Sequence, residues 1–257
     1  MRRFTISKPD SHLVACVEEI PDCPERIVIA VHGFTSSKES PTVQLLLKRM
    51  PEAGIGVIGI DLPSHGVEDS YEEELRLKAC LDSIEAAENY AVREYPDAKI
   101  CYFGSSFGAY TTALYISTRQ HKGRRAFFRS AAVNMPSLFI KDSLTEEDEE
   151  LRRELEEKGY FMQGFSLGRP VKITQAFIDD LGENNLFDKF DPGRFGPHKI
   201  AMAHGAEDPV IDPDAAARFA RQFDIEETVF DGEGHSLCND PGTPDKVVDL
   251  AIELFNS

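Results

Sequence analysis

Short apolar runs alternate along this chain with longer segments whose apolar residues recur at helical spacing. Several of the runs are continuously apolar, which is typical of strands covered on both faces. The pattern predicts strands over Phe4–Ile6, Leu13–Glu18, Arg26–His32, Gly56–Asp61, Ile100–Phe103, Ala126–Val133, His198–Ala203 and Thr228–Phe230.

Helical periodicity fills most of the intervals between these strands. The first helix carries its own start signal, because Ser40 can cap it and Pro41 suits its first turn. Since strands alternate with helices from residue 26 onward, we expect an α/β fold with a mostly parallel central sheet flanked by helices. The predicted helices are Ser40–Met50, Glu72–Glu94, Ala109–Gln120, Leu144–Lys158, Pro213–Gln222 and Pro244–Phe255.

Residues 136–195 interrupt this alternation. A highly charged helix with a narrow leucine stripe comes first, and we expect its charges to form a solvated face. We interpret the segment as a helical cap inserted into a core of residues 1–135 and 196–257, with the whole chain forming one integrated domain. One to three of its aromatic residues should line a substrate cleft, and Phe165 is the candidate we select. The aromatic residues are Tyr160, Phe161, Phe165, Phe177, Phe187, Phe190 and Phe195.

Composition narrows the possible partners. The formal net charge of the 257-residue chain is -17, and such a surface repels nucleic acid and anionic membranes. We therefore expect neither as a partner. No apolar stretch approaches the length of a membrane span, and no apolar region follows the N-terminal arginines, so a cytoplasmic location is expected. The five cysteines are scattered without a C-x-x-C pair, which fits reduced thiols.

Gly104-Ser105-Ser106-Phe107-Gly108 carries the strongest chemical signal in the chain. It reads G-x-S-x-G, follows a predicted strand and precedes a predicted helix. A serine at such a corner lies in a strained turn that exposes its hydroxyl group, and the glycines let other backbones pass close by. The motif predicts Ser106 as a covalent nucleophile for acyl transfer.

Two further glycine patterns lack the context that their chemistry requires. Gly164–Gly168 also reads G-x-S-x-G, around Ser166, but no β-branched run precedes it and Arg169-Pro170 follows where a helix should begin. Gly54–Gly59 matches G-x-G-x-x-G, yet its glycines lie before or within a strand, so no helix N-terminus is offered to a pyrophosphate. We interpret the second pattern as turn and close-packing glycines.

A serine hydroxyl group is a weak nucleophile and needs a general base, which a carboxylate orients in turn. Among seven histidines we select His235, in a glycine-flexed loop just before the last helix. Asp208 follows a late strand in H-G-A-E-D-P-V and suits the chain order nucleophile, acid, histidine. Glu207 and Asp212 are the rival acids. His204 is expected to be satisfied by backbone hydrogen bonds.

The loop after the first buried strand, His32-Gly33-Phe34, is expected to complete the site. Acyl transfer needs two backbone amides facing the developing oxyanion. Phe107 follows the nucleophile and Phe34 lies in this loop, so their amides are the candidates. Gly33 permits the turn and is a candidate for substrate contact. His32 should anchor the loop.

The next strand ends in Asp61-Leu62-Pro63-Ser64-His65-Gly66. His65 is a candidate for substrate contact in this loop. The alternative interpretation is that it holds the loop on the rim of the site through hydrogen bonds to backbone groups.

These motifs, in this order, resemble the α/β-hydrolase superfamily over nearly the whole chain: H-G-F, D-L-P-S-H-G, G-S-S-F-G, H-G-A-E-D-P-V and G-E-G-H. The chain is most similar to the serine aminopeptidase-like, monoacylglycerol lipase-like and cinnamoyl esterase-like members. The resemblance implies Ser106, Asp208 and His235 as a triad, with Phe34 and Phe107 as oxyanion-hole residues. One departure concerns the loop shape, since relatives commonly have glycine where Ser64 stands. No H-G-G-G stretch occurs, which argues against the hormone-sensitive lipase-like branch.

The sequence therefore predicts a serine hydrolase that cleaves a small carboxylic ester through an acyl-enzyme intermediate. Its expected partner is a small-molecule ester, and no cofactor or metal is expected because the histidines are dispersed without an H-E-x-x-H motif. Two alternatives remain open, namely a peptidase or amidase and a non-catalytic ligand-binding protein on the same fold. A peptidase could use Glu183, Asp188 or Asp191 to recognise an amino terminus. The sequence leaves the oligomeric state open.

Overall fold

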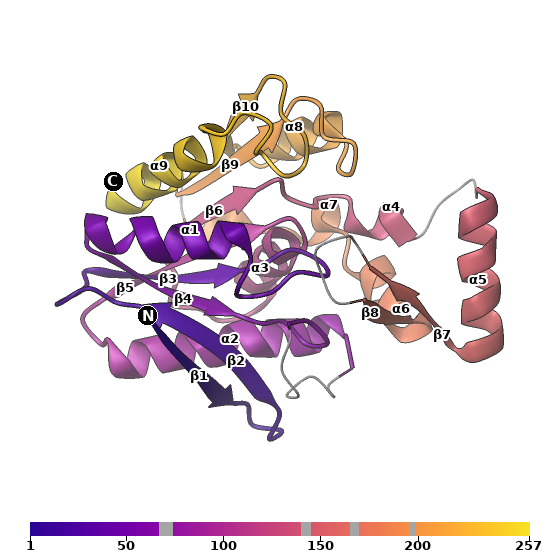
Figure 1. Cartoon of the computed structure of the whole chain (residues 1–257), viewed down its shortest axis with the longest axis horizontal. Helices are drawn as coiled ribbons and strands as arrows, with labels where there is room; N and C mark the ends of the chain where they lie inside the picture. The colour runs from indigo at the N-terminus through magenta and orange to yellow at the C-terminus, as the bar shows by residue number, and fades with distance from the viewer. Residues whose placement is uncertain (67–73, 140–144, 165–169, 196–198) are drawn as a thin grey trace.

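A computed structural model of the chain describes residues 1–66, 74–139, 145–164, 170–195 and 199–257 (Figure 1). Its centre is an eight-stranded sheet with the strand order β1-β2-β4-β3-β5-β6-β9-β10. The pairs from β4 to β10 are parallel, whereas β1 and β2 add antiparallel pairs at one edge. The mostly parallel α/β sheet is thereby confirmed. The strands are β1 (Arg2–Ser7), β2 (Leu13–Glu19), β3 (Arg26–Val31), β4 (Ile55–Ile60), β5 (Lys99–Ser105), β6 (Arg125–Arg129), β9 (Ile200–Gly205) and β10 (Glu226–Phe230).

Helices cover both faces of this sheet, which explains why its central strands are apolar on both sides. The helices α1 (Pro41–Arg49) and α9 (Thr243–Asn256) share one buried cluster, and α2 (Leu77–Glu94), α3 (Phe107–Thr118) and α8 (Pro213–Gln222) share the other. The short 3₁₀ turn η1 (Pro51–Ala53) follows α1. The predicted cap of α1 is present, because the Ser40 side chain accepts a hydrogen bond from the Val43 amide.

The strand predicted over Ala126–Val133 is shorter in the structure. β6 ends at Arg129, because Ser130 adopts a left-handed backbone conformation with φ of 45° and turns the chain. The helix α4 (Met135–Phe139) then begins one residue before the expected cap of residues 136–195. Most other boundaries shift by one or two residues. Glu72, Leu144 and His198, with which three predicted elements begin, lie outside the described residues.

The segment between β6 and β9 combines helices with a hairpin that the sequence pattern did not predict. β7 and β8 pair antiparallel with Tyr160 opposite Thr174. Val171 and Ile173 are buried and Lys172 is exposed, so the strand periodicity was present, although only over four residues. Figure 1 places α5 at the end of the molecule farthest from the sheet. The elements after α4 are α5 (Glu146–Lys158), β7 (Tyr160–Gln163), β8 (Val171–Thr174), α6 (Gln175–Glu183), α7 (Leu186–Lys189) and η2 (Pro192–Arg194).

An ion pair fastens this segment to the sheet domain. The guanidinium group of Arg76, just before α2, donates to both carboxylate oxygens of Asp180 on α6, at 2.7 and 2.8 Å. The Leu77 amide donates to the same carboxylate at 3.1 Å. A bidentate pair of this kind fixes orientation as well as distance. The start of α2 and the helix α6 are therefore held together.

Candidate active site

Ser106 lies at the sharp turn between β5 and α3. Its backbone has φ of 52°, a left-handed conformation that a non-glycine residue adopts only when its surroundings enforce it. Here the Ser106 amide donates to the Arg129 carbonyl oxygen at 2.8 Å, and its own carbonyl oxygen accepts from Ala109 and Tyr110. These bonds hold the serine at the start of α3, as the motif predicts.

The two motif glycines are required by close approach of backbone to backbone. A Cβ atom on Gly108 would lie 2.2 Å from the Val31 carbonyl oxygen, because α3 packs directly on the end of β3. A Cβ atom on Gly104 would lie 2.5 Å from the Ala109 Cα atom. Neither neighbour can move without shifting the main chain, so the turn cannot form around larger residues at these positions.

Three predicted residues form one chain of hydrogen bonds. The Ser106 Oγ atom lies 2.9 Å from Nε2 of His235, and Nδ1 of His235 lies 2.8 Å from Oδ2 of Asp208. They come from the turn after β5 and the loops after β10 and β9. Because these strands are parallel, their carboxyl ends meet at one edge of the sheet. The geometry allows His235 to take a proton from Ser106 while Asp208 fixes its tautomer.

Asp208 lies in a buried and strongly polar environment. Its Oδ1 atom accepts hydrogen bonds from the amides of Val210 and Ile211, at 2.8 and 3.0 Å. Burial acts to raise the pKa of this carboxyl group, but the hydrogen bonds with His204 and His235 outweigh it and hold the pKa well below its usual range. Asp208 is therefore ionised wherever the protein is folded at ordinary pH.

The rival acids have other roles. Asp212 accepts a hydrogen bond from the Asp214 amide and caps α8, and Glu207 is exposed to solvent. His204 differs from its prediction. Its Nε2 atom lies 3.3 Å from the Ile211 carbonyl oxygen, as a backbone-satisfied histidine would, but also 3.1 Å from Oδ2 of Asp208. The spacing of four residues across a loop gave no sequence signal for this second contact.

Further residues that sequence reasoning missed hold the His235 loop. The Ser130 hydroxyl group donates to the His235 carbonyl oxygen at 2.8 Å, and the Arg129 guanidinium group donates to the carbonyl oxygen of Ser236. Gly205 makes room for the loop, since a Cβ atom there would lie 2.3 Å from the Glu233 carbonyl oxygen. The left-handed Ser130 that ends β6 thus also fixes the histidine.

Phe34 and Phe107 lie on either side of the nucleophile turn. A Cβ atom on Gly33 would be 3.3 Å from Cβ of Ser106, so the loop after β3 passes directly beside the serine. The rings of Phe34 and Phe107 meet edge to face, with centroids 5.4 Å apart. Within the described part of the chain, neither amide donates a hydrogen bond to another group. Both amides therefore remain available as hydrogen-bond donors.

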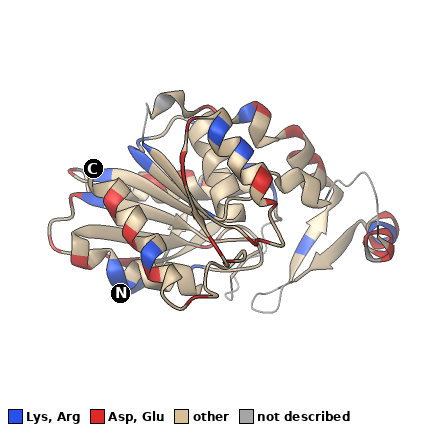
Figure 2. Cartoon of the chain, turned by 90° about the horizontal axis from the view of Figure 1, so that it is seen from above, with Lys and Arg blue, Asp and Glu red and all other residues tan. Residues whose placement is uncertain are grey.

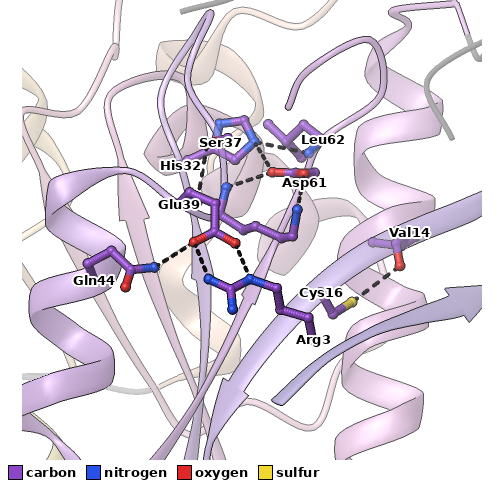
Figure 3. Close-up of polar contacts among 10 residues, drawn as sticks. Arg3, Val14, Cys16, His32, Ser37, Glu39, Gln44, Asp61 and Leu62 are labelled. Carbon is purple, nitrogen blue, oxygen red and sulfur yellow. Dashed lines mark hydrogen bonds and ion pairs between the residues drawn. The ribbon is translucent and has the colours of Figure 1, made fainter. Parts of the chain in front are cut away.

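His32 anchors the Gly33–Phe34 loop, in the role expected for it. Its Nδ1 atom donates to the Gly33 carbonyl oxygen at 2.7 Å. Its Nε2 atom accepts from the Leu62 amide at 3.1 Å, as Figure 3 shows. The ring is therefore neutral, with its proton on Nδ1. Asp61 beside it forms a buried ion pair of 2.9 Å with Lys38, which ties the loops after β3 and β4 together.

His65 is placed differently from the substrate contact expected for it. Its side chain is fully buried and does not line the cavity described below. Its Nδ1 atom donates to the Pro63 carbonyl oxygen at 2.8 Å. The ring of Phe34 packs against the imidazole ring, with the two ring centroids 5.4 Å apart. Ser64 has φ of 62°, a left-handed conformation that glycine adopts more readily than serine. His65 therefore supports the loop and does not reach the cavity.

The buried His65 should make the protein sensitive to mild acid. Burial first, and the neighbouring imidazole group of His32 second, lower the pKa of His65 from 6.5 to about 3. The unfolded chain therefore binds this proton at higher pH than the folded chain does. The contribution of neutral His65 to the unfolding free energy is fully present above pH 6.5 and is lost as the pH falls towards 3. We expect His65→Gln to reduce the slope of unfolding free energy against pH by about 1.4 kcal/mol per pH unit between pH 6 and pH 4. Urea titrations at each pH measure this slope.

The exposed His12 supplies the control for this experiment. His12→Gln should leave the slope close to that of the wild-type protein. An unchanged slope in His65→Gln would contradict the assignment of a buried, neutral His65.

A cavity of about 1170 Å³ opens above Ser106 and His235. Gly33 and Phe34 line it, as expected of the loop after β3. Phe161 is the residue of the predicted aromatic group found in its wall, whereas Phe165 and Ser166 lie outside the described residues. The apolar part of the wall comes mainly from the segment between β6 and β9 and includes Met135, Leu138, Phe139, Leu151, Leu155 and Phe161.

Neither a metal centre nor a membrane span is found in the described ranges. No group of three or more histidine, cysteine or acidic side chains there could hold a metal ion. No helix in the same ranges is both long and apolar enough to cross a bilayer.

The family model described as "Serine aminopeptidase, S33" (Hydrolase_4) matches residues 22–168, which is more than half of the chain. The chain belongs to this family of α/β hydrolases. The suspected superfamily is thereby confirmed. No curated protein matches the chain at a significant level.

Solved structures share the fold over nearly their full lengths. A putative hydrolase from Agrobacterium vitis S4 is 20% identical, with a TM-score of 0.79 over 98% of this chain and 97% of its own. Est1E from Butyrivibrio proteoclasticus is 17% identical, with a TM-score of 0.76 over 100% of both chains. A carboxyl esterase from Bacillus coagulans, solved in complex with glycerol, is 16% identical, with a TM-score of 0.69 over 99% of this chain and 97% of its own. At these identities the likeness establishes the α/β-hydrolase fold.

Proposed function

We propose that this protein is a serine carboxylesterase in which Ser106, His235 and Asp208 form the catalytic triad. The observation that carries the proposal is the continuous chain of hydrogen bonds among these residues, with distances of 2.9 and 2.8 Å, at the floor of a large cavity. The two unbonded amides beside Ser106 supply the other component that acyl transfer requires.

In the first half of the reaction, the Ser106 Oγ atom attacks the ester carbonyl carbon while His235 Nε2 takes the hydroxyl proton. The carbonyl oxygen becomes an oxyanion, which the amides of Phe34 and Phe107 stabilise. Phe107 is the first residue of α3, so the positive end of that helix points at the same charge. The carbon–oxygen bond to the alcohol then breaks, and His235 gives its proton to the departing oxygen.

In the second half, water attacks the carbonyl carbon of the acyl-enzyme. His235 takes a proton from the water, the oxyanion forms again at the same amides, and the Ser106 oxygen leaves with the proton returned by His235. The carboxylic acid is released and the serine is restored. Asp208 stays ionised throughout and stabilises the imidazolium ion, a role that suits its lowered pKa.

The acyl group is proposed to bind under residues 136–195, acting as a cap. This segment contributes the apolar side chains of Leu138, Phe139, Leu151, Leu155 and Phe161 around the cavity, and Met135 directly precedes it; such walls bind apolar groups. Esterases are found among the solved structures that share this fold, and one structure of Est1E has ferulic acid bound. That description favours an ester of a sizeable apolar acid over an acetate.

An aminopeptidase activity is the second candidate, because the family model bears that description. It would require a carboxylate placed to receive the substrate's ammonium group. Glu183, Asp188 and Asp191 do not line the cavity. Of the acids that do, Asp245 pairs with Arg49 and Asp148 caps α5. The geometry therefore favours esters.

A panel of p-nitrophenyl esters from acetate to long-chain acyl groups tests the proposal, with aminoacyl p-nitroanilides as the comparison. We expect saturable ester hydrolysis with an optimum above acetate, weak anilide cleavage, and labelling of the protein by a fluorophosphonate probe. Preferential anilide cleavage would indicate the peptidase. Absence of both turnover and labelling would indicate a non-catalytic binding protein.

A further inference from the structure

Arg129, the last residue of β6, lines the cavity next to the nucleophile turn. Its guanidinium group donates to the Ser105 hydroxyl group at 2.9 Å and to the Ser236 carbonyl oxygen. It therefore bridges the residue before the nucleophile and the residue after the proposed general base. Both acceptors are uncharged, so the positive charge of Arg129 is hydrogen-bonded but not neutralised by them.

Arg129 has no acidic partner in the described residues, although the chain is strongly acidic overall. Acidic residues outnumber lysines and arginines by 45 to 28, and Figure 2 shows acidic residues on many of the helices. Within the described ranges, no carboxylate lies at ion-pair distance from Arg129. Burial lowers the pKa of this arginine to about 10, and the interactions with Cys238, Asp208 and Glu233 compensate only in part. The site thus holds a charge at an energetic cost.

Other charged residues in the cavity wall have partners of their own. Arg152 pairs with Glu156 on α5, and Asp245 pairs with Arg49. Asp148 accepts hydrogen bonds from the amide and hydroxyl group of Thr145 and closes the capping box of α5. Arg129 is therefore the charged group in the described wall that is best placed to bind a charge on a ligand.

We propose that Arg129 binds an anionic group, a carboxylate or a phosphate, on the alcohol part of the ester. This inference rests on the proposed esterase function and adds the substrate class. His235 must give its proton to the departing alcohol oxygen, so the alcohol part of the ester lies next to His235. Arg129 donates a hydrogen bond to Ser236, the residue that follows His235, and is therefore close to the alcohol part. The apolar side chains of Met135, Leu138, Phe139, Leu151, Leu155 and Phe161 lie on the proposed acyl side.

A guanidinium group suits this role because its planar set of donors matches a carboxylate or a phosphate in a bidentate manner. Within the described residues, Arg129 donates two side-chain hydrogen bonds, which leaves further N–H donors of the guanidinium group for a ligand. Binding an anion would also restore the favourable electrostatic environment that burial removes. Substrates with an anionic alcohol should therefore be selected over neutral ones of the same shape.

Three aryl hexanoates test the proposal: 3-carboxyphenyl, 3-phosphonophenyl and the neutral 3-carbamoylphenyl hexanoate. The readout is the ratio of kcat/KM for an anionic ester to that for the neutral ester, because a merely structural role of Arg129 would lower both values and leave the ratio unchanged. We expect wild-type ratios of about tenfold or more, as charge-assisted hydrogen bonds are about twice as strong as neutral ones. Whichever anionic ester shows the higher ratio identifies carboxylate or phosphate.

Arg129→Gln should bring the ratio close to one, and Arg129→Lys should retain part of it because the charge remains without the planar geometry. Arg152→Gln removes an equal charge from the same cavity wall and should keep the wild-type ratio. A wild-type ratio near one, or an unchanged ratio in Arg129→Gln, would overturn the inference while leaving the esterase proposal standing. Failure of the wild-type protein to hydrolyse any of the three esters, together with no fluorophosphonate labelling, would overturn both.

Discussion

Replacing Ser106 with alanine is expected to lower kcat for p-nitrophenyl ester hydrolysis by about a thousandfold or more. The substitution removes the oxygen that attacks the carbonyl carbon and leaves His235 Nε2 without its partner at 2.9 Å. The cavity and the candidate oxyanion amides remain, so KM should change far less than kcat. Initial rates over a range of ester concentrations, with the variant's urea unfolding curve measured in parallel, separate loss of chemistry from loss of folding.

The second G-x-S-x-G pattern supplies a matched control. Ser166→Ala removes the same hydroxyl group from the same type of motif and should leave kcat within about twofold, since sequence context argues against a nucleophile there. Fluorophosphonate labelling should disappear in Ser106→Ala and persist in Ser166→Ala. The reverse result, or full activity in Ser106→Ala, would refute the assignment of the nucleophile.

Asp208→Asn is expected to lower kcat by about four orders of magnitude, as removal of the orienting carboxylate does in other serine hydrolases. The carboxylate oxygen accepts from Nδ1 of His235 at 2.8 Å, which leaves Nε2 free to accept the proton of Ser106. An asparagine can present its amide group to Nδ1, and the ring proton then moves to Nε2. In that tautomer His235 cannot act as the general base. The size of the side chain is unchanged, so the effect isolates the charge and the tautomer.

Asp212→Asn provides the comparison for this variant. Asp212 is one of the two rival acids in the sequence and caps α8 in the structure, with its side chain accepting a hydrogen bond from the Asp214 amide at 3.0 Å. An asparagine caps a helix about as well as an aspartate, so its kcat and its unfolding free energy should both stay near those of the wild-type protein. A large loss of kcat in Asp212→Asn with an active Asp208→Asn would reassign the acid.

The sequence by itself predicted the α/β fold, and it did so because each local pattern agreed with the next. Continuous apolar runs alternated with helical periodicity, which admits few arrangements other than a parallel sheet covered on both faces. Ser106, Asp208 and His235 were predictable because each follows a strand that points to the same edge of the sheet. The required glycines at 104 and 108 were visible as well, although the carbonyl oxygens that exclude a larger residue were not.

Features that depend on contacts between distant segments were decided only by the tertiary structure. The hairpin of β7 and β8 consists of two four-residue strands, too short for a periodicity to be distinguished from loop. The sequence places His65 and His204 in loops near the site. Only the tertiary structure shows that His65 is buried against the ring of Phe34 and that His204 contacts Asp208.

Arg129 shows the same limit most clearly. It reads in the sequence as the polar end of a strand, and nothing local predicts that its guanidinium group joins the loops of the nucleophile and the histidine. The strand pattern determines that the residue lies at the edge of the sheet. The hydrogen bonds, the lack of an acidic partner in the described residues and the exposure to the cavity arise from chain segments more than 20 residues away, as the separations of 24 and 107 residues for its two bonds show. Local sequence determines the elements and their order, whereas partners brought together by folding determine what each charge can do.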